Sequence, residues 1–418
     1  MDLKVYINDV GKRAKQASVR MAAIDSATKG RALLAMADAV RANADAVKRE
    51  NAKDLEAGRN NGLSDALIDR LTVDDSGIEK IAKAISEIAA QTDPVGEITD
   101  MVRRPSGIEV GRMRVPIGVV GIIYESRPNV TADAAALCLK AGNACILRGG
   151  REAFHSNMIL AKVLRDAGTQ SGLPENAIQL IEVTDRETVT LLAQAVGLVD
   201  VIIPRGGEGL IRAVVDAAKI PVIKHFDGIC HTYVDAEADT DMAISICFNA
   251  KVQRPGVCNA METLLVHRDA AQRVLPPLFA KYRKAGVELR GDQTTRAIDS
   301  DVLPATDADW KTEYLDLILS VKVVESIDDA MDHIRTYGSA HTDAIVTNNV
   351  FTARRFVREV DSSSVMVNAS TRFSDGGEYG LGAEIGISTD KLHARGPMGA
   401  AELTTYKWVV YGEGTIRT

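Results

Sequence analysis

Cysteine is scarce in this sequence. Only five cysteines occur in 418 residues, and so sparse and odd a set does not support a disulfide framework. No two of them form a CxxC pair, and none stands at zinc-site spacing from a histidine, so no metal site is expected. The ordinary role of such cysteines is that of small, reduced, buried side chains. The five are Cys138, Cys145, Cys230, Cys247 and Cys258.

Long apolar runs and basic clusters are absent as well. No stretch approaches the roughly 18 consecutive apolar residues of a membrane-spanning helix. The first residues, MDLKVYINDV, lack the charged start and apolar core of a secretory signal, so a cytoplasmic protein is expected. The net charge of -7 argues against binding to nucleic acid or to anionic membranes. We therefore expect the partners to be small molecules and other subunits.

The amino-acid composition is that of a globular protein. Apolar residues make up 46% of the chain and charged residues 26%, and the length allows two or three domains. The first hundred residues have apolar side chains at helical spacing. One helix is predicted to begin near Ser26 and to continue toward Gly62, and a capping-box pattern, Ser76 to Glu79, predicts the start of another.

Beyond Ile108 the pattern changes to alternating strands and helices. Residues 108–115 predict an extended hairpin centred on Gly111, and residues 117–123 predict a buried strand. Single helices of about 10 to 15 residues between strands indicate parallel βαβ units, so the expected fold class is α/β. A second series starts near His231, which divides the chain near residue 228. The further predicted strands are 144–148, 178–183, 200–204, 221–224, 231–235, 262–267, 318–324, 343–347, 363–367 and 406–411.

Two glycine-containing turns follow predicted strands. They are LRGGRE, residues 147–152, and PRGGEG, residues 204–209. Both come just past the carboxyl ends of strands, where open α/β sheets bind ligands, and the second leads into a helix N-terminus. Neither is GxGxxG, so an ordinary turn is the alternative for each. Arg148 and Arg151 favour an extra phosphate, as in NADP, although surface arginines are the alternative there.

Cys258 stands in a different context from the other cysteines. The segment 252–263, VQRPGVCNAMET, places it in a Gly/Pro-containing turn before a predicted strand. A thiolate at such a turn is a good nucleophile toward an acyl carbon, and the amides of Cys258 and Asn259 can stabilise the developing oxyanion. From spacing alone, a structural cysteine and a nucleophile are equally good interpretations.

Several longer motifs carry a resemblance that extends over almost the whole chain. They are IGVVGIIYESRPNVTADAAALCLKAGNACILRGGREA, VQRPGVCNAMET, GLGAEIGISTDKLHARGPMG and ELTTYKWVVYGEG. With these motifs the sequence resembles the aldehyde dehydrogenase superfamily and, within it, the gamma-glutamyl phosphate reductase family. The resemblance implies reduction of L-glutamyl 5-phosphate by NADPH to L-glutamate 5-semialdehyde in L-proline biosynthesis, with release of phosphate through a cysteine thioester.

The resemblance also implies a role for individual residues. Cys258 matches the catalytic thiol, and Asn129 matches the asparagine that helps to hold the oxyanion. Arg148 falls where the superfamily usually has a lysine near the adenosine ribose, and Arg151 falls where NAD-preferring members often have an acidic residue. Both replacements agree with NADPH. Glu313 matches the glutamate that binds the nicotinamide ribose. The full set expected to bind NADPH is Arg148, Gly149, Gly150, Arg151, Arg205, Gly206, Gly207 and Glu313.

One position departs from the superfamily pattern. Hydrolytic aldehyde dehydrogenases have a water-activating glutamate where this sequence has His225, which suits a thioester that must survive until hydride arrives. Asp227 would restore a carboxylate if the alignment shifted by two residues. Arg127, Arg254 and Arg372 are expected in loops facing the cleft, as partners of substrate phosphate and carboxylate, and a surface role is the alternative for each.

The family architecture implies how the chain is divided. An NADPH-binding domain would comprise 1–100 and 117–228, and a catalytic domain 229–368. An oligomerisation element would combine 101–116 with 400–418, and 369–399 would return toward the cofactor domain and cleft. A homodimer or homotetramer is implied, and a transient contact with glutamate 5-kinase is a separate hypothesis that the sequence does not test. The rival functions are oxidation of a semialdehyde with NAD, and a scaffold that kept the fold without catalysis.

Overall fold

The computed structural model describes residues 1–417 and divides them into two compact units. Unit 1 contains Met1–Lys224, Gly380–Gly386 and residues 398–417, and unit 2 contains His225–Tyr379 and Ile387–Pro397. Within the described range, none of the helices has the length and apolar character that a membrane span requires. Each unit is built around its own parallel sheet, and the predicted α/β fold class is confirmed.

Helices open unit 1, as the apolar spacing predicts. They are α1 (Leu3–Met21), α2 (Ser26–Ala42), α3 (Ala44–Asn60), α4 (Asp65–Leu71) and α5 (Asp75–Ala90). The prediction of one helix from Ser26 toward Gly62 is wrong, because the helix is interrupted at Asn43, whose side chain donates to the Ala39 carbonyl. The capping box is also wrong: α5 begins earlier, and the Asp74 carboxylate caps it by accepting from the Gly77 amide at 2.7 Å.

The sheet of unit 1 has the strand order β5-β4-β3-β6, and all its pairings are parallel. The predicted strand 221–224 is wrong, because only Val222 forms a bridge, to Ile202. Its strands are β3 (Val119–Tyr124), β4 (Ala144–Gly149), β5 (Ile178–Leu180) and β6 (Val201–Arg205). The connecting and flanking helices are α6 (Asn129–Lys140), α7 (Phe154–Gln170), α8 (Glu187–Ala193) and α9 (Glu208–Ala217), with a short 3₁₀ turn at Arg151–Ala153.

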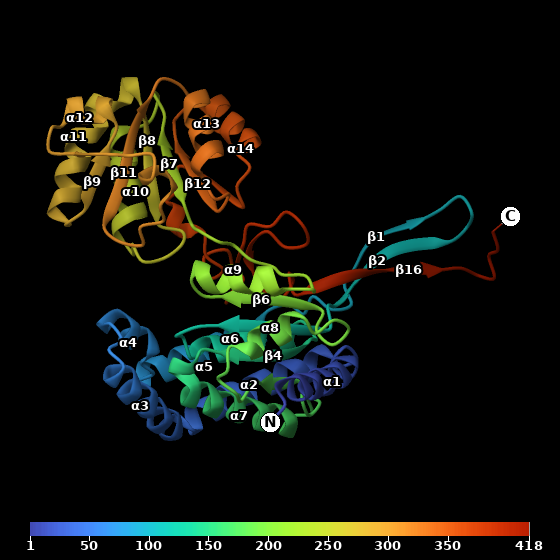
Figure 1. Cartoon of the computed structure of the whole chain (residues 1–418). Helices are drawn as coiled ribbons and strands as arrows, with labels where there is room; N and C mark the ends of the chain where they lie inside the picture. The colour runs from blue at the N-terminus through green and yellow to red at the C-terminus, as the bar shows by residue number, and fades with distance from the viewer. Residues whose placement is uncertain (418) are drawn as a thin grey trace. The chain divides into compact units, whose positions relative to one another are not determined.

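A three-stranded antiparallel sheet forms an arm of unit 1 (Figure 1). It joins β1 (Ile98–Arg103), β2 (Glu109–Pro116) and β16 (Thr404–Tyr411) in that order. The terminal strand therefore pairs with the hairpin, as predicted. The predicted centre of the hairpin is wrong, because the chain turns between β1 and β2 and Gly111 lies inside β2, opposite Val409.

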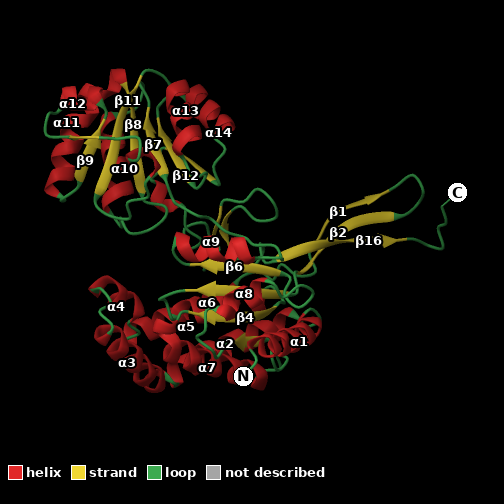
Figure 2. Cartoon of the chain, viewed as in Figure 1, coloured by secondary structure: helices red, strands yellow, loops and turns green. Residues whose placement is uncertain are grey.

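Unit 2 contains a seven-stranded sheet between two layers of helices (Figure 2). Adjacent residues of β7 belong to different cores: Val234 packs with α10 and α11, and Tyr233 packs with α13 and α14. In sheet order the strands are β10 (Leu303–Pro304), β9 (Glu288–Gly291), β11 (Ile318–Val324), β8 (Met261–His267), β7 (Cys230–Val234), β12 (Thr342–Val346) and β13 (Ser364–Val367). Its helices are α10 (Thr240–Val252), α11 (Arg268–Lys284), α12 (Gln293–Ile298), α13 (Ile327–Tyr337) and α14 (Val350–Glu359), with 3₁₀ turns at Asp309–Lys311 and Thr371–Phe373. A separate two-stranded sheet pairs β14 (Gly386–Ser388) with β15 (Gly396–Met398).

Candidate active site

Cys258 lies in the turn that connects α10 to β8. Of the five cysteines, all within the described range, four are buried and Cys258 is partly exposed. The two ends of the turn are joined by an ion pair between Lys251 Nζ and Glu262 Oε2 at 2.6 Å, and both side chains are almost fully buried. Burial raises the pKa of Glu262 to about 7 and lowers the pKa of Lys251, while the ion pair opposes both shifts. The pair holds together the last turn of α10 and the start of β8.

Cys230 and Gly228 pack closely against the backbone of Cys258. The Cys258 carbonyl accepts a hydrogen bond from the Cys230 thiol at 3.2 Å, and burial raises the pKa of that thiol, so Cys230 remains a donor. A Cβ atom built on Gly228 would lie 2.0 Å from the same carbonyl oxygen. Only glycine therefore fits at position 228. This close contact fixes the position of the Cys258 turn relative to the segment before β7.

Two histidines face the thiol of Cys258. One ligand atom of each of His225, Cys258 and His341 lies within 4.8 Å of the others. His225 Nδ1 lies 2.7 Å from the Ile387 carbonyl, which can only accept, so Nδ1 carries the proton and Nε2 is the basic nitrogen of the neutral ring. His341 is buried, and its Nδ1 lies 2.9 Å from Thr342 Oγ1. A thiol between two imidazoles has a proton acceptor close at hand.

Asn259 and Arg372 connect the turn to the segment around residue 372. The buried Asn259 side chain donates from Nδ2 to the Ser374 carbonyl at 2.8 Å. Arg372 donates from Nε to Gln253 Oε1 at 2.8 Å. Burial lowers the pKa of Arg372, the positive charge of Arg254 lowers it further, and the thiol of Cys258 opposes the shift. The structure thus brings Arg254, Arg372 and Cys258 within electrostatic reach of one another.

Glu313 reaches the same region from the loop before β11. Its Oε1 accepts from the Gly228 amide at 3.0 Å, and Gly228 in turn contacts the Cys258 backbone. Glu313 and Cys258 are therefore linked through one residue. The Gly228 amide is a backbone donor that helps to hold the Glu313 carboxylate in place.

In unit 1 both glycine turns lie at one edge of the sheet. Tyr124, the last residue of β3, is in register with Gly149 on one side and with Arg205 on the other. Because parallel strands end at the same edge, the two turns are neighbours there. Gly206 and Gly207 are exposed, and the Gly207 amide donates to Glu125 Oε2 at 3.1 Å at the start of α9. Backbone amides are exposed at this edge of the sheet, and the Glu125 carboxylate accepts a hydrogen bond from one of them.

The two arginines of the first turn differ in their surroundings. Arg148 is buried, and its guanidinium donates to the carbonyls of Gly149, Thr184 and Asp185. Burial also lowers the pKa of Arg148. Arg151 is exposed in the 3₁₀ turn after β4. Arg148 thus organises the 184–188 loop, whereas Arg151 is the arginine with an accessible charge.

Asn129 and Arg127 belong to the loop between β3 and α6 in unit 1. Asn129 is exposed as the first residue of α6, and its Nδ2 donates to Asp133 Oδ2 at 2.9 Å. Burial raises the pKa of Asp133 to about 6, against the lowering effect of that hydrogen bond. Arg127 is half-buried. The amide of Asn129 is thus engaged by Asp133 one helical turn further on.

Several residues at these sites escaped the sequence interpretation. Three of them, His341, Cys230 and Lys251, stand outside the quoted motifs. Glu262 and Glu125 stand inside motifs, but no role was assigned to either, and their contacts are visible only in the folded chain. The one indication of the ion pair in the sequence was a lysine and a glutamate on the two sides of a Gly/Pro turn. Lysine and glutamate are rarely buried unless they are paired. The histidine near the thiol becomes visible only once β7 and β12 are placed side by side.

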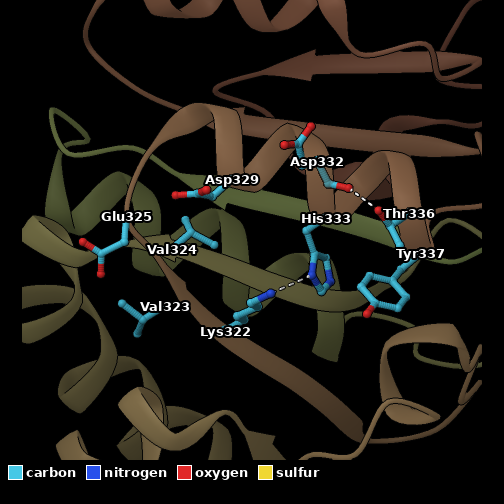
Figure 3. Close-up of a pocket in the computed structure, with 9 residues that line it drawn as sticks. All are labelled: Lys322, Val323, Val324, Glu325, Asp329, Asp332, His333, Thr336 and Tyr337. Atoms are coloured by element: carbon cyan, nitrogen blue, oxygen red, sulfur yellow. Dashed lines mark hydrogen bonds between the residues drawn. The ribbon is translucent and has the colours of Figure 1, made fainter.

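A separate cavity of about 440 Å³ in unit 2 contains none of the predicted site residues (Figure 3). It lies between the end of β11 and one face of α13, and Lys322 Nζ lies 3.4 Å from His333 Nδ1 there. Burial, with His231 and Lys322 nearby, lowers the pKa of His333 to about 3, so its ring is neutral. The lining residues are Lys322, Val323, Val324, Glu325, Asp329, Asp332, His333, Thr336 and Tyr337.

Comparison with known proteins gives a consistent result. Residues 4–302 match the model of the aldehyde dehydrogenase family. A gamma-glutamyl phosphate reductase of Moorella thermoacetica is 56% identical over 417 residues, with all of both chains covered. The crystal structure of a gamma-glutamyl phosphate reductase from Thermotoga maritima has a TM-score of 0.97 at 44% identity, with 99% of this chain and 100% of that chain covered. The corresponding Saccharomyces cerevisiae structure has a TM-score of 0.55 at 32% identity, with 98% of each chain covered.

Proposed function

The chain belongs to the aldehyde dehydrogenase family, and we propose that it reduces L-glutamyl 5-phosphate to L-glutamate 5-semialdehyde with NADPH, releasing phosphate, in L-proline biosynthesis. The relatives at 56% and 44% identity carry the name gamma-glutamyl phosphate reductase. The observation that carries the proposal is the partly exposed Cys258, held in a braced turn between two imidazoles. That arrangement suits a nucleophile attacking an acyl carbon.

The sheet edge of unit 1 fits a dinucleotide. Exposed Gly206 and Gly207 lead into the ten-residue helix α9, whose first amides can receive a pyrophosphate. Arg151 is proposed as the accessible charge for the additional phosphate of NADPH, and Arg148 is proposed to hold the neighbouring 184–188 segment in place. Glu313 is proposed to hold the nicotinamide ribose. When bound, the cofactor supplies hydride to the acyl carbon.

Cys258 is proposed to take the acyl group. The S–H bond breaks as the C–S bond forms, and His225 is proposed to accept the proton at Nε2, since its Nδ1 is engaged by the Ile387 carbonyl. The C–O bond to phosphate then breaks, and phosphate leaves with the electron pair. The product is a thioester on Cys258. Because His225 replaces the water-activating glutamate of hydrolytic members, the thioester persists for reduction.

The remaining roles concern charge. Asn129 and the amide of Cys258 are proposed to stabilise the oxyanion at both tetrahedral stages, at about 3 to 4 kcal/mol per donor. One N–H of Asn129 Nδ2 donates to Asp133, so the second N–H of the same amide is the proposed oxyanion donor. Arg254 and Arg372 are proposed partners for the substrate's phosphate and carboxylate, with Arg127 of unit 1 as a third candidate. No metal is required by these steps.

The arm supports a proposal about assembly. β1 and β16 are both edge strands, and exposed apolar side chains lie along β16. Edge strands of this kind pair with other chains, so we propose a homodimer or homotetramer in which the arm takes part. The exposed residues include Tyr406, Trp408, Val410 and Tyr411. A cytoplasmic location and a transient contact with glutamate 5-kinase remain predictions.

The test is the Cys258→Ala variant, assayed with freshly generated glutamyl phosphate and NADPH. We expect turnover to be lost while NADPH binding is largely retained. Cys247→Ala, which removes a buried thiol in α10, is the matched control and is expected to keep turnover. Reduction by Cys258→Ala at the wild-type rate would overturn the mechanism.

The rival functions give other results. An NAD-dependent semialdehyde oxidase would form free acid from aldehyde without added phosphate. A scaffold without catalysis would be unaffected by the loss of Cys258 in every assay. Phosphate release coupled one to one with NADPH oxidation separates the proposal from both.

A further inference from the structure

Three side chains with metal-binding atoms meet in unit 2. They are Cys258 from the turn before β8, His225 from the segment before β7, and His341, the residue just before β12. Their ligand atoms all lie within 4.8 Å of one another. His341 is buried, and the other two are partly exposed. One thiol and two imidazoles converging on one point form a ligand set that Zn²⁺ prefers.

We infer that this Cys258–His225–His341 set is a Zn²⁺ site, and that bound Zn²⁺ reversibly blocks the nucleophile. The metal site itself rests only on the three side chains. Its inhibitory consequence rests on the proposed function, in which Cys258 is the acyl acceptor. Three protein ligands leave one position of a tetrahedral ion for water, so the ion remains accessible to chelators.

The distances permit the site with a small adjustment. Zn–S bonds of about 2.3 Å and Zn–N bonds of about 2.0 to 2.1 Å place tetrahedral ligand atoms about 3.3 to 3.6 Å apart. The observed limit of 4.8 Å therefore requires a contraction of about 1 Å. Rotation of the partly exposed Cys258 side chain shortens its distances to the two rings, while its backbone stays fixed by Gly228 and Cys230. Any contraction between the rings falls to His225, which is also partly exposed.

The outer contacts already orient both rings. His225 donates from Nδ1 to the Ile387 carbonyl, and Nδ1 of His341 lies beside Thr342 Oγ1. Second contacts of this kind hold metal-ligating histidines with the opposite nitrogen toward the ion. The nearby charges are mixed: Arg372 and Arg254 oppose a cation, and Glu313 favours one.

Zn²⁺ binding at this site involves no oxidation or reduction. The S–H bond of Cys258 breaks, an S–Zn bond forms, and the proton passes to solvent. Both imidazoles bind as neutral ligands. The sulfur lone pair that would attack the acyl carbon is then engaged by the metal, so acylation and metal binding exclude each other.

The experiment titrates the metal-free full-length protein with Zn²⁺ by calorimetry, and with Co²⁺ while the thiolate-to-cobalt absorption is recorded. We expect one ion per chain and an absorption that disappears in Cys258→Ala. His225→Gln removes a direct ligand and is expected to weaken Zn²⁺ binding by more than about 100-fold, the upper end of the cost of losing an outer-shell partner. Cys247→Ala is the matched thiol control and is expected to bind as the wild type does. Because His341 is buried, circular dichroism accompanies His341→Gln, and His225→Gln decides the result if that variant does not fold.

Two outcomes of the calorimetry overturn the inference. Equal affinity in wild type, Cys258→Ala and His225→Gln means an adventitious surface ion, and loss of binding in Cys258→Ala alone means a thiol acting without the histidines. Turnover inhibited by Zn²⁺ and restored by a chelator is the expected functional result. The cobalt spectrum needs no turnover, so a failure of the proposed reaction leaves the metal site standing, and a missing spectrum with normal turnover removes only the metal site.

Discussion

The nucleophile turn of unit 2 and the glycine edge of unit 1 are built in opposite ways. The turn around Cys258 is braced by a buried ion pair, by a buried amide, and by a glycine packed so closely that an added Cβ would overlap the Cys258 carbonyl. The edge around Gly206 and Gly207 is exposed, and its one amide contact is to the exposed carboxylate of Glu125. The turn around Cys258 is held in place by buried side-chain contacts. The glycine edge is left open.

This difference fits the two proposed tasks. A nucleophile must meet the acyl carbon at a fixed position through two tetrahedral stages, so misplacement is costly. A cofactor must enter and leave in every cycle. The backbone amides that bind it therefore need only a weak hydrogen-bond partner that the cofactor can displace. The predictions below break one region or the other, and a braced region is expected to respond more strongly than an open one.

The largest effect is expected from Lys251→Met. Removing one partner leaves the Glu262 carboxylate buried and unpaired, and we expect the free energy of unfolding to fall by about 3 to 5 kcal/mol. Equilibrium denaturation measures the loss. The double variant Lys251→Met, Glu262→Leu is the control and is expected to recover much of it, since no lone charge remains. A loss below about 1 kcal/mol in the single variant would show that the pair does not brace the turn.

Gly228→Ala is expected to come next. Its Cβ would lie 2.0 Å from the Cys258 carbonyl oxygen, so the turn must move by about 1 Å or more. A shift of that size is expected to reduce kcat by about 100-fold. Gly209→Ala, where a Cβ meets nothing within 4 Å, is the matched control and is expected to keep its rate. Equal rates in the two variants would contradict a braced turn.

A smaller effect is expected from Asp133, beside the open edge. Because the native pKa of about 6 lies above the ordinary value of 3.8, the carboxylate destabilises the native state above pH 6. As the pH falls from about 7 toward 4, the native carboxyl takes up its proton before the unfolded one, so stability is gained. We expect a gain of about 1 to 2 kcal/mol relative to Asp133→Asn, measured by denaturation at each pH. Parallel pH curves for the two proteins would refute it.

The smallest effect is expected from Glu125→Ala. The carboxylate accepts from the Gly207 amide at the start of α9, where the cofactor pyrophosphate is proposed to bind. Removing it frees that amide, and we expect NADPH to bind about two- to five-fold more tightly, corresponding to about 0.3 to 1 kcal/mol. Fluorescence titration measures the change, with Glu208→Ala as the control for lost charge at the same helix end. Weaker binding in Glu125→Ala would mean that the carboxylate assists the cofactor.

Much of the fold was accessible from the sequence because its signals are local. Strand 318–324 and the parallel series around it follow from apolar runs separated by helices. The errors fall where tertiary contacts decide: Asn43 ends α2 within a continuous apolar pattern, and Val222 forms a bridge without a strand. The short strand β9 went unpredicted because ELRG carries two charged residues and one buried apolar side chain.

The candidate site was accessible only in part. Cys258 stood out through its turn and the family motif, and no local pattern pointed to His341, since β7 and β12 meet only in the folded sheet. Asn129 and Arg148 matched family positions, yet each side chain is engaged elsewhere by neighbours, Asp133 and the 184–188 loop, that a motif does not specify. Motifs identify residue types, whereas their partners depend on packing.

The central claim is that Cys258 carries the acyl group, and intact-protein mass spectrometry tests it most directly. Wild-type protein is mixed with freshly generated glutamyl phosphate without NADPH, quenched in acid, and mapped by peptide. The account predicts one glutamyl adduct per chain on the peptide containing Cys258, its disappearance when NADPH is added, and its absence in Cys258→Ala. An adduct on another residue, or NADPH oxidation at the normal rate with no adduct in wild type and full activity in Cys258→Ala, would contradict the account.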